Sequence, residues 1–267
     1  MANLLSYDAS QLLVFLLVLI RVGGVLTTAP IFGSSNIPAQ IKIVVILVFS
    51  LILNPFLPSP TVLPEQIHHF LMLVFSELLI GVTLGLIGKI LFAAVEFAGA
   101  MTGFQMGLSI ANVFDPASMQ QVSLLSKLET LIASLVFLSL DGPILVIQAM
   151  VRSYQLIPVG QATMGNDLAS MMIQLSSGIF SIGFQLGAPL IIALLITNLI
   201  LGLLSRSVPQ IQIFVVGFPL TLMMGFIFLL LGMPFMIQAI RIMFGLYDDQ
   251  MLDAIPVSYT HLRAHET

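Results

Sequence analysis

Residues that could perform acid–base, nucleophilic or metal chemistry are few in this 267-residue sequence. It has no Cys and 4 His, and it contains neither an H-E-x-x-H zinc motif nor a G-x-S-x-G nucleophile motif. His68 and His69 are adjacent, so they face different directions on a helix, and no third metal ligand lies at a suitable spacing. Asp248 and Asp249 are also adjacent, and they lie near an end of the apolar sequence, where such acids are more often solvated than catalytic. We therefore predict no catalytic, cofactor-binding or metal site, and no enzymatic activity.

Isolated charges inside long apolar runs are the remaining candidates for a functional role. A charged side chain in hydrocarbon is costly unless another polar group pairs with it. Arg21 either snorkels to an interface or pairs with carbonyl groups, or it makes an inter-subunit or pore-lining contact. Lys89 and Glu96, seven residues apart on nearly the same helical face, can form an ion pair between packed helices or subunits, or along a conduction path. The candidates for buried charges are Arg21, Glu77, Lys89, Glu96 and Arg206.

Glycines repeated every four residues indicate helix faces on which another backbone can approach closely. Gly99, Gly103 and Gly107 form one such ridge, which precedes a helix break. Gly183 and Gly187 repeat the spacing further along the chain. Another pair lies on the same broad side as Lys89 and Glu96. The predicted helix-packing positions are Gly81, Gly85, Gly99, Gly103, Gly107, Gly183 and Gly187.

The stretch from 99 to 121 joins the first glycine ridge to a break between two apolar segments. Asn112, Asp115 and Pro116 interrupt the helix; Asp115 can cap the next helix while Pro116 occupies its first turn. The intervening loop is too apolar for an ordinary solvated connection, so we expect it to pack inside a protein. Its apolar side chains are Met106, Leu108, Ile110, Val113, Phe114 and Met119.

The composition places these features in a membrane. Hydrophobic residues make up 58% of the chain, charged residues only 7%, and the mean hydropathy is +1.12, whereas about a quarter of the residues of a soluble domain are charged. The net charge of −4 offers no basic surface for nucleic acid. We predict an all-α integral membrane protein with one membrane domain, residues 1–255. A polar, non-native or disordered tail is expected at 256–267.

About six hydrophobic stretches are expected, as broken helices and helical hairpins. Three of them exceed one membrane crossing, because a helix rises 1.5 Å per residue. Pro189, Pro219 and Pro234 predict breaks within the last two. Lys and Arg divide evenly between the two sides, so the orientation is left open. The expected helical segments are about 11–28, 39–53, 70–106, 116–140, 144–157, 168–204 and 211–247.

Four stretches, in their order and spacing, resemble the FliR/SctT family of type III secretion export-gate proteins. The resemblance covers residues 1 to about 250. No single stretch is as specific as a metal motif, but the four together are. They are RVGGVLTTAPIFGSSNIPAQIK from Arg21, ELLIGVTLGLIGKILFAAVEFAGAMTGFQMG from Glu77, SIANVFDPASMQQ from Ser109 and RSVPQIQIFVVGFPL from Arg206.

The resemblance implies a subunit of the flagellar protein export gate, in the bacterial inner membrane at the flagellar basal body. In this family one copy assembles with several copies of FliP and FliQ into a closed helical ring, which FlhB contacts. The fold is described as FliP-like and FliQ-like hairpins that project above the membrane. The loop at about 106–121 would then plug the channel for unfolded secreted proteins, beside a methionine-rich gasket. Met suits such a seal because its unbranched thioether adapts to irregular surfaces.

Two other functions fit the sequence. A small secondary transporter with a substrate site at the membrane midplane is one, because discontinuous helices and intramembrane charges also build such sites. An assembly scaffold without pore contact is the other. A transporter predicts ion-coupled flux by the purified chain alone, whereas an export gate predicts function only in a hetero-oligomer. Reaction of cysteines placed along 106–121 with a secreted substrate distinguishes a conduit from a scaffold.

Overall fold

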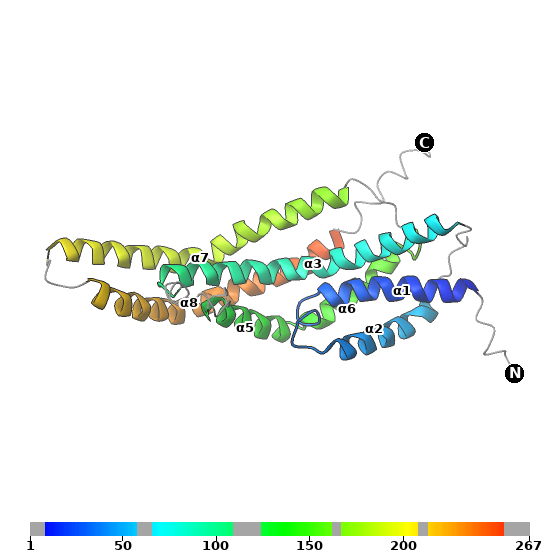
Figure 1. Ribbon diagram of the computed structural model, residues 1–267, viewed down its shortest axis with the longest axis horizontal. Helices are drawn as coiled ribbons and strands as arrows, with labels where there is room; N and C mark the ends of the chain where they lie inside the picture. The colour runs from blue at the N-terminus through cyan, green and yellow to red at the C-terminus, as the bar shows by residue number, and fades with distance from the viewer. Residues whose placement is uncertain (1–8, 58–65, 109–123, 162–166, 208–212, 254–267) are drawn as a thin grey trace. The chain divides into compact units, whose positions relative to one another are not determined.

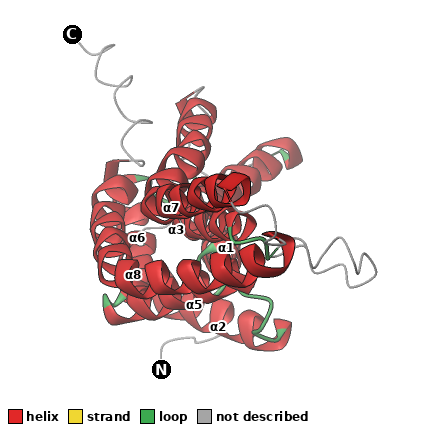
Figure 2. Cartoon of the chain, turned by 90° about the vertical axis from the view of Figure 1, so that its left-hand side faces the viewer, coloured by secondary structure: helices red, strands yellow, loops and turns green. Residues whose placement is uncertain are grey.

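The structure, a computed structural model, describes residues 9–57, 66–108, 124–161, 167–207 and 213–253. Within these ranges the chain forms helices joined by loops, and no strand is present (Figure 2). The all-α prediction is confirmed. The elements are α1 (Ala9–Thr28), α2 (Ala39–Leu53), η1 (Asn54–Phe56), α3 (Ile67–Gln105), α5 (Leu124–Ser139), α6 (Gly142–Leu156), α7 (Asp167–Ser207) and α8 (Ile213–Asp253) (Figure 1).

Five of the described helices are long and apolar enough to cross a membrane, and a sixth span results if α5 and α6 form one broken span. This agrees with the prediction of about six hydrophobic stretches. The candidate span in α1 covers Gln11–Thr28, and α2 begins and ends where the apolar run predicts. The most apolar window of 18 residues in each span has a mean hydropathy between 2.0 and 2.3, so these helices suit hydrocarbon.

Helices α3, α7 and α8 contain 39, 41 and 41 residues. At 1.5 Å per residue they are roughly 60 Å long, about twice the hydrocarbon thickness. The predicted breaks are wrong, because Pro189, Pro219 and Pro234 lie inside continuous helices. Each proline removes one backbone hydrogen-bond donor. A break in the helix would instead leave several backbone N–H and C=O groups without hydrogen bonds in an apolar environment. Around Pro219, the Thr221 hydroxyl also donates a hydrogen bond to the Gly217 carbonyl.

Contacts divide the chain into two compact units. The first contains residues 1–89, 141–175 and 245–267, and the second contains 90–140 and 176–244. In the first unit, buried residues of α1 recur at three- and four-residue spacing, which gives one helical stripe facing α3 and α6. Its core includes Val14, Leu17, Val18, Val22 and Val25 from α1, Ile80, Leu84 and Ile87 from α3, and Val146, Ala149 and Met150 from α6.

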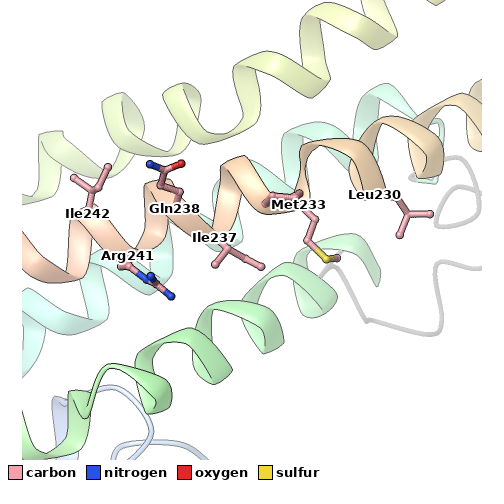
Figure 3. A pocket seen from close by; sticks show the side chains of 7 residues that line it. Leu230, Met233, Ile237, Gln238, Arg241 and Ile242 are labelled. Atoms are coloured by element: carbon pink, nitrogen blue, oxygen red, sulfur yellow. The ribbon is translucent and has the colours of Figure 1, made fainter.

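The second unit has its own apolar core, formed by the end of α3 with α5, α7 and α8. Phe92, Phe137 and Phe244 form one aromatic group, with ring centroids 5.0 to 5.6 Å apart. A neighbouring cluster consists of Met106, Leu125, Leu190, Leu194 and Leu229. The outer face of α8 carries an open groove (Figure 3).

The end of α3 is defined by a glycine cap. Gly107 has a φ of 79°, in the left-handed region. Its N–H donates to the Phe104 carbonyl at 3.0 Å, and the Leu108 N–H donates to the Gly103 carbonyl at 3.0 Å. This is the Schellman arrangement, in which glycine pays little steric cost. The prediction that Gly107 extends the helix ridge is therefore wrong: Gly107 ends the helix.

Candidate functional site

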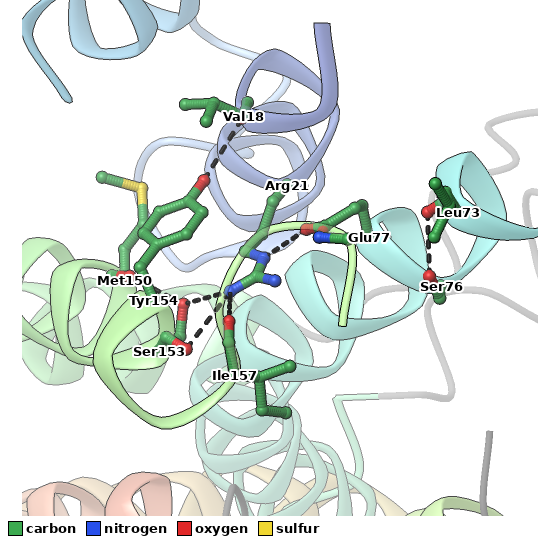
Figure 4. Close-up of polar contacts among 10 residues, drawn as sticks. Val18, Arg21, Leu73, Ser76, Glu77, Met150, Ser153, Tyr154 and Ile157 are labelled. Atoms are coloured by element: carbon green, nitrogen blue, oxygen red, sulfur yellow. Dashed lines mark hydrogen bonds and ion pairs between the residues drawn. The ribbon is translucent and has the colours of Figure 1, made fainter. Parts of the chain in front are cut away.

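The strongest polar site of the first unit is built around Arg21, in the middle of α1 (Figure 4). Arg21 lies on the apolar stripe of α1 with Leu17, Val18 and Val25, so helical packing turns its side chain into the core. It is fully buried. A buried guanidinium must meet several acceptors, because its five donors lose all their water.

Glu77 of α3 supplies the counter-charge. Arg21 Nε donates to Glu77 Oε2 at 2.5 Å, and both side chains are 0% exposed. The other carboxylate oxygen, Oε1, accepts the N–H of Gly160 at 2.9 Å. Gly160 has a φ of 76°, which a side chain would make unfavourable. Both oxygens of the buried carboxylate are thus satisfied.

Helix α6 and the residue after it provide three further acceptors, all for Nη1, while Nη2 is buried without a hydrogen-bond partner among the described residues. Arg21 Nη1 donates to the Ile157 carbonyl at 2.9 Å, to the Ser153 carbonyl at 3.2 Å and to Ser153 Oγ at 3.3 Å. The guanidinium carbon lies 4.3 Å from the centroid of the Tyr154 ring, a cation–π distance. The Tyr154 hydroxyl donates to the Val18 carbonyl at 3.3 Å. Arg21 therefore joins α1, α3 and α6.

Close contact between α1 and α3 brings the two charges within reach. A Cβ added to Gly24 would lie 3.0 Å from the Val82 nitrogen, and one added to Gly85 would lie 2.7 Å from the Val25 carbonyl oxygen. Gly81 would likewise collide with the Arg21 carbonyl. Only glycine allows this backbone separation. The structure thus places Gly81 and Gly85 at the contact between α1 and α3.

The other three predicted buried charges are not buried in this chain. Lys89, Glu96 and Arg206 are exposed. Among the described residues the ion pair recorded is Arg21–Glu77, and none joins Lys89 to Glu96. The two side chains therefore do not pair within this chain, because the exposed side of α3 turns both away from the core; their pairing at a contact between subunits stays a prediction. Arg21 finds its partner within the chain, instead of at a subunit contact or a pore.

Two of the six predicted plug residues lie in the described part of the chain. Met106 is fully buried in the core of the second unit, and a Cβ on Gly225 would lie 2.5 Å from its Cε. Leu108 packs against the same core. Met106 thus anchors the end of α3, and its part in a plug stays a prediction. The other residues of this prediction, namely Ile110, Val113, Phe114 and Met119, and the helix start at Asp115 and Pro116, lie outside the described residues.

Glycines also lie at helix contacts in the second unit. A Cβ on Gly99 would lie 2.6 Å from the Ser126 Cα, and Ser126 Oγ donates to the Glu96 carbonyl at 2.5 Å. A Cβ on Gly183 would lie 2.7 Å from the Ala94 carbonyl oxygen. Gly187 is less crowded by another helix, since a Cβ there would lie 3.2 Å from the Ile191 side chain of its own helix and 3.6 Å from the Ala98 backbone. Gly103 is buried.

Several residues that complete these sites were not identified from the sequence. Ser153, Tyr154 and Gly160 contact the ion pair, and Gly225 leaves the space that the Met106 side chain fills. Glu129 is 2% exposed beside Gly99. One signal in the sequence was available: Arg21 and Glu77 are opposite charges in the middle of two apolar runs, and each needs a partner.

Helices long and apolar enough to cross a bilayer define the chain as a helical membrane protein. The family model "Bacterial export proteins, family 1" matches residues 12–246, and the chain belongs to this family. It is 37% identical to the flagellar biosynthetic protein FliR of Bacillus subtilis over 240 residues, 89% of this chain and 92% of the relative. It is also 37% identical to FliR of Escherichia coli over 216 residues, 81% of this chain and 82% of the relative. For FliR of Aquifex aeolicus the identity is 34% over 223 residues, 84% and 86% of the two chains.

Proposed function

We propose that this chain is a core subunit of the flagellar type III protein export gate. The observation that carries the proposal is the match of residues 12–246 to a bacterial export family whose relatives include flagellar biosynthetic proteins. With FliP and FliQ the chain forms the channel through which unfolded flagellar proteins cross the inner membrane. FlhB contacts this complex, which belongs to the basal body.

The lengths of the helices support assembly with other subunits. The candidate span of α3 extends over 39 residues, and its most apolar window of 18 residues has a mean hydropathy of 2.3, whereas about 20 residues cross the hydrocarbon. Apolar surface that continues beyond the bilayer must be covered by protein. In the most apolar windows of 18 residues in the spans of α2 and α8, only 6% and 22% of the residues are buried within the chain. Partner helices of FliP and FliQ would cover these surfaces, and the exposed Lys89, Glu96 and Arg206 would face them.

In this proposal the Arg21–Glu77 pair holds α1, α3 and α6 together and does not bind a substrate. Its charges neutralise each other, and their hydrogen bonds go to α6 and Gly160. A midplane transport site would instead direct such groups into a cavity. The secondary-transporter hypothesis is therefore the weaker one. The membrane domain at 1–255 acts as one assembly subunit in this proposal.

The loop at 106–121 closes the channel in this proposal. Met106 and Leu108 attach its first residues to the core of the second unit, and the Gly107 cap directs the chain out of α3. Ile110, Val113, Phe114 and Met119 would then form an apolar constriction. Such a constriction excludes water and ions without any charge or metal.

Co-purification tests the proposal. The chain would be co-expressed with the FliP and FliQ proteins of the same bacterium, purified through a tag on this chain, and measured by native mass spectrometry. We expect a complex with one copy of this chain and several copies of each partner. A chain that purifies alone as a stable monomer and supports substrate-dependent ion flux in liposomes would instead establish the transporter.

A further inference from the structure

Glu129 of α5 is a buried acid that takes no part in the ion pair described above. It is 2% exposed and lies on the buried face of α5, in the second unit. A Cβ added to Gly99 of α3 would lie 3.0 Å from Glu129 Oε2 and 2.6 Å from the Ser126 Cα. The carboxyl group is therefore enclosed where the backbones of α3 and α5 come close together.

No basic side chain of the second unit neutralises this carboxyl group within the described part of the chain. Its three basic residues are exposed and come from different helices, namely Lys127 of α5, Arg206 of α7 and Arg241 of α8. Glu96, the other acid described in this unit, is exposed on α3. The ion pair in the described residues is Arg21–Glu77, in the first unit. The sequence of the segment 109–123 contains no Lys, Arg or His.

The hydroxyl groups near this carboxyl group on α5 do not donate to it. Ser126 Oγ donates to the Glu96 carbonyl at 2.5 Å, and Thr130 Oγ1 is buried without a hydrogen-bond partner among the described residues. A carboxylate buried without a counter-charge is so unfavourable that the group takes up a proton instead. Glu77 shows the contrast in the same chain, because Arg21 compensates its charge.

We propose that Glu129 is a proton-binding site whose proton keeps α5 packed against α3. The protonated carboxyl group is neutral and fits the contact at Gly99. When its O–H bond breaks, the proton passes to water, and the carboxylate left behind must be hydrated, which requires the two helices to separate. Helices α3 and α5 flank the loop at 106–121 in the sequence, so this contact fixes the two helices that the loop connects. The site does not depend on the export role, because this chain alone forms it.

Infrared spectroscopy of the full-length chain in detergent tests the protonation state. A protonated carboxyl group has a C=O stretching band that a carboxylate lacks, and exposed acids are ionised at about pH 6. We expect the parent chain to show this band at that pH and Glu129→Gln to lose it. Glu96→Gln is the matched control, because it removes an exposed acid from the neighbouring helix, and it should retain the band.

The pH dependence of thermal unfolding tests the effect of the proton on the helix contact. The unfolded chain releases this proton above about pH 4.3, the ordinary value for a glutamic acid, whereas the folded chain retains it. The stability of the parent chain should therefore fall as the pH rises towards neutral. One released proton raises the unfolding constant about tenfold per pH unit. Glu129→Gln should lack this contribution, and Glu96→Gln should keep it.

The variant Glu129→Gln also separates a proton from a required charge. Glutamine has the size of the neutral acid and no charge, so this variant should be at least as stable as the parent at neutral pH. A lower unfolding midpoint for Glu129→Gln at neutral pH would overturn the proposal, since a charge would then be needed at this position. So would a parent chain without the infrared band, or the same pH dependence of unfolding in Glu129→Gln and the parent.

Discussion

Arg21 Nε lies 2.5 Å from Glu77 Oε2, and both side chains are fully buried although they are 56 residues apart in the sequence. The pair joins α1 to α3, and its remaining hydrogen bonds reach α6 and Gly160. Buried pairs of this kind contribute little compared with an apolar replacement, but removal of one partner leaves an uncompensated charge. The site therefore makes the arrangement of three helices sensitive to single substitutions.

Single substitutions of the pair should be more harmful than the double substitution. Arg21→Met or Glu77→Gln alone should destabilise the first unit by about 3 to 5 kcal/mol, because one buried group loses its partner. The double variant leaves no charge and should recover part of this loss. Thermal unfolding of the purified chain, followed by circular dichroism, measures the three midpoints.

Lys89→Met is the matched control for the pair, because Lys89 is exposed on the same helix as Glu77. It should change the unfolding midpoint little. If the effects of the Arg21 and Glu77 substitutions simply add, the pair has no coupling and the structural account of this site is wrong.

Gly85 should tolerate no side chain, whereas Gly202 should. A Cβ at Gly85 would collide with the backbone of Val25 and Ala29, while at Gly202 nothing lies within 4 Å. Gly85→Ala should therefore lower the unfolding midpoint. Gly202→Ala should raise stability by up to about 1 kcal/mol, because alanine favours the helix. Paired thermal melts of the two variants decide the point, and a drop of similar size in both would contradict it.

Met106 and Gly225 should be energetically coupled. Gly225→Ala forces a Cβ against the Met106 side chain, and such overpacking costs about 1 to 3 kcal/mol. Met106→Ala alone should cost about 2 to 5 kcal/mol through the cavity that it leaves. In the Met106→Ala background, Gly225→Ala should cost much less, because the space is then free. A double-mutant cycle from chemical denaturation measures this coupling; a zero coupling energy would disprove the contact.

Removal of the apolar loop should open the proposed channel. Deletion of 110–114 retains Gly107 and Leu108, which end α3, and Asp115 and Pro116, which can begin the next helix. We expect the co-expressed complex to assemble and to leak small ions and solutes, because no hydrophobic constriction is left. Entry of a small solute into cells expressing the complex measures the leak.

Ile110→Ser with Phe114→Ser is the graded control for the deletion. This loop still fills space, although its surface is wetted, so it should leak less than the deletion. Complex yield is measured for each variant. A fully assembled deletion complex as tight as the parent would show that this loop is not the barrier.

The helical fold was predictable from the sequence because membrane helices depend on local properties. Hydrophobic runs of sufficient length indicate a span whatever they pack against, and so α1 and α2 were predicted closely. The charged residues that need partners were also recognisable from their apolar surroundings. Proline was misleading, because its effect on a helix depends on the environment: the long helices at Pro219 and Pro234 continue where a soluble chain would break.

Only the tertiary structure decided which charges meet. Lys89 and Glu96 share a helical face, but that face points outward, whereas Arg21 meets Glu77 through the packing of two helices distant in sequence. Gly107 ends a helix rather than extending a ridge because its φ is positive, which glycine spacing does not reveal. Spacing along one helix defines which residues share a face. Which face is buried depends on the other helices, and that is a property of the folded chain alone.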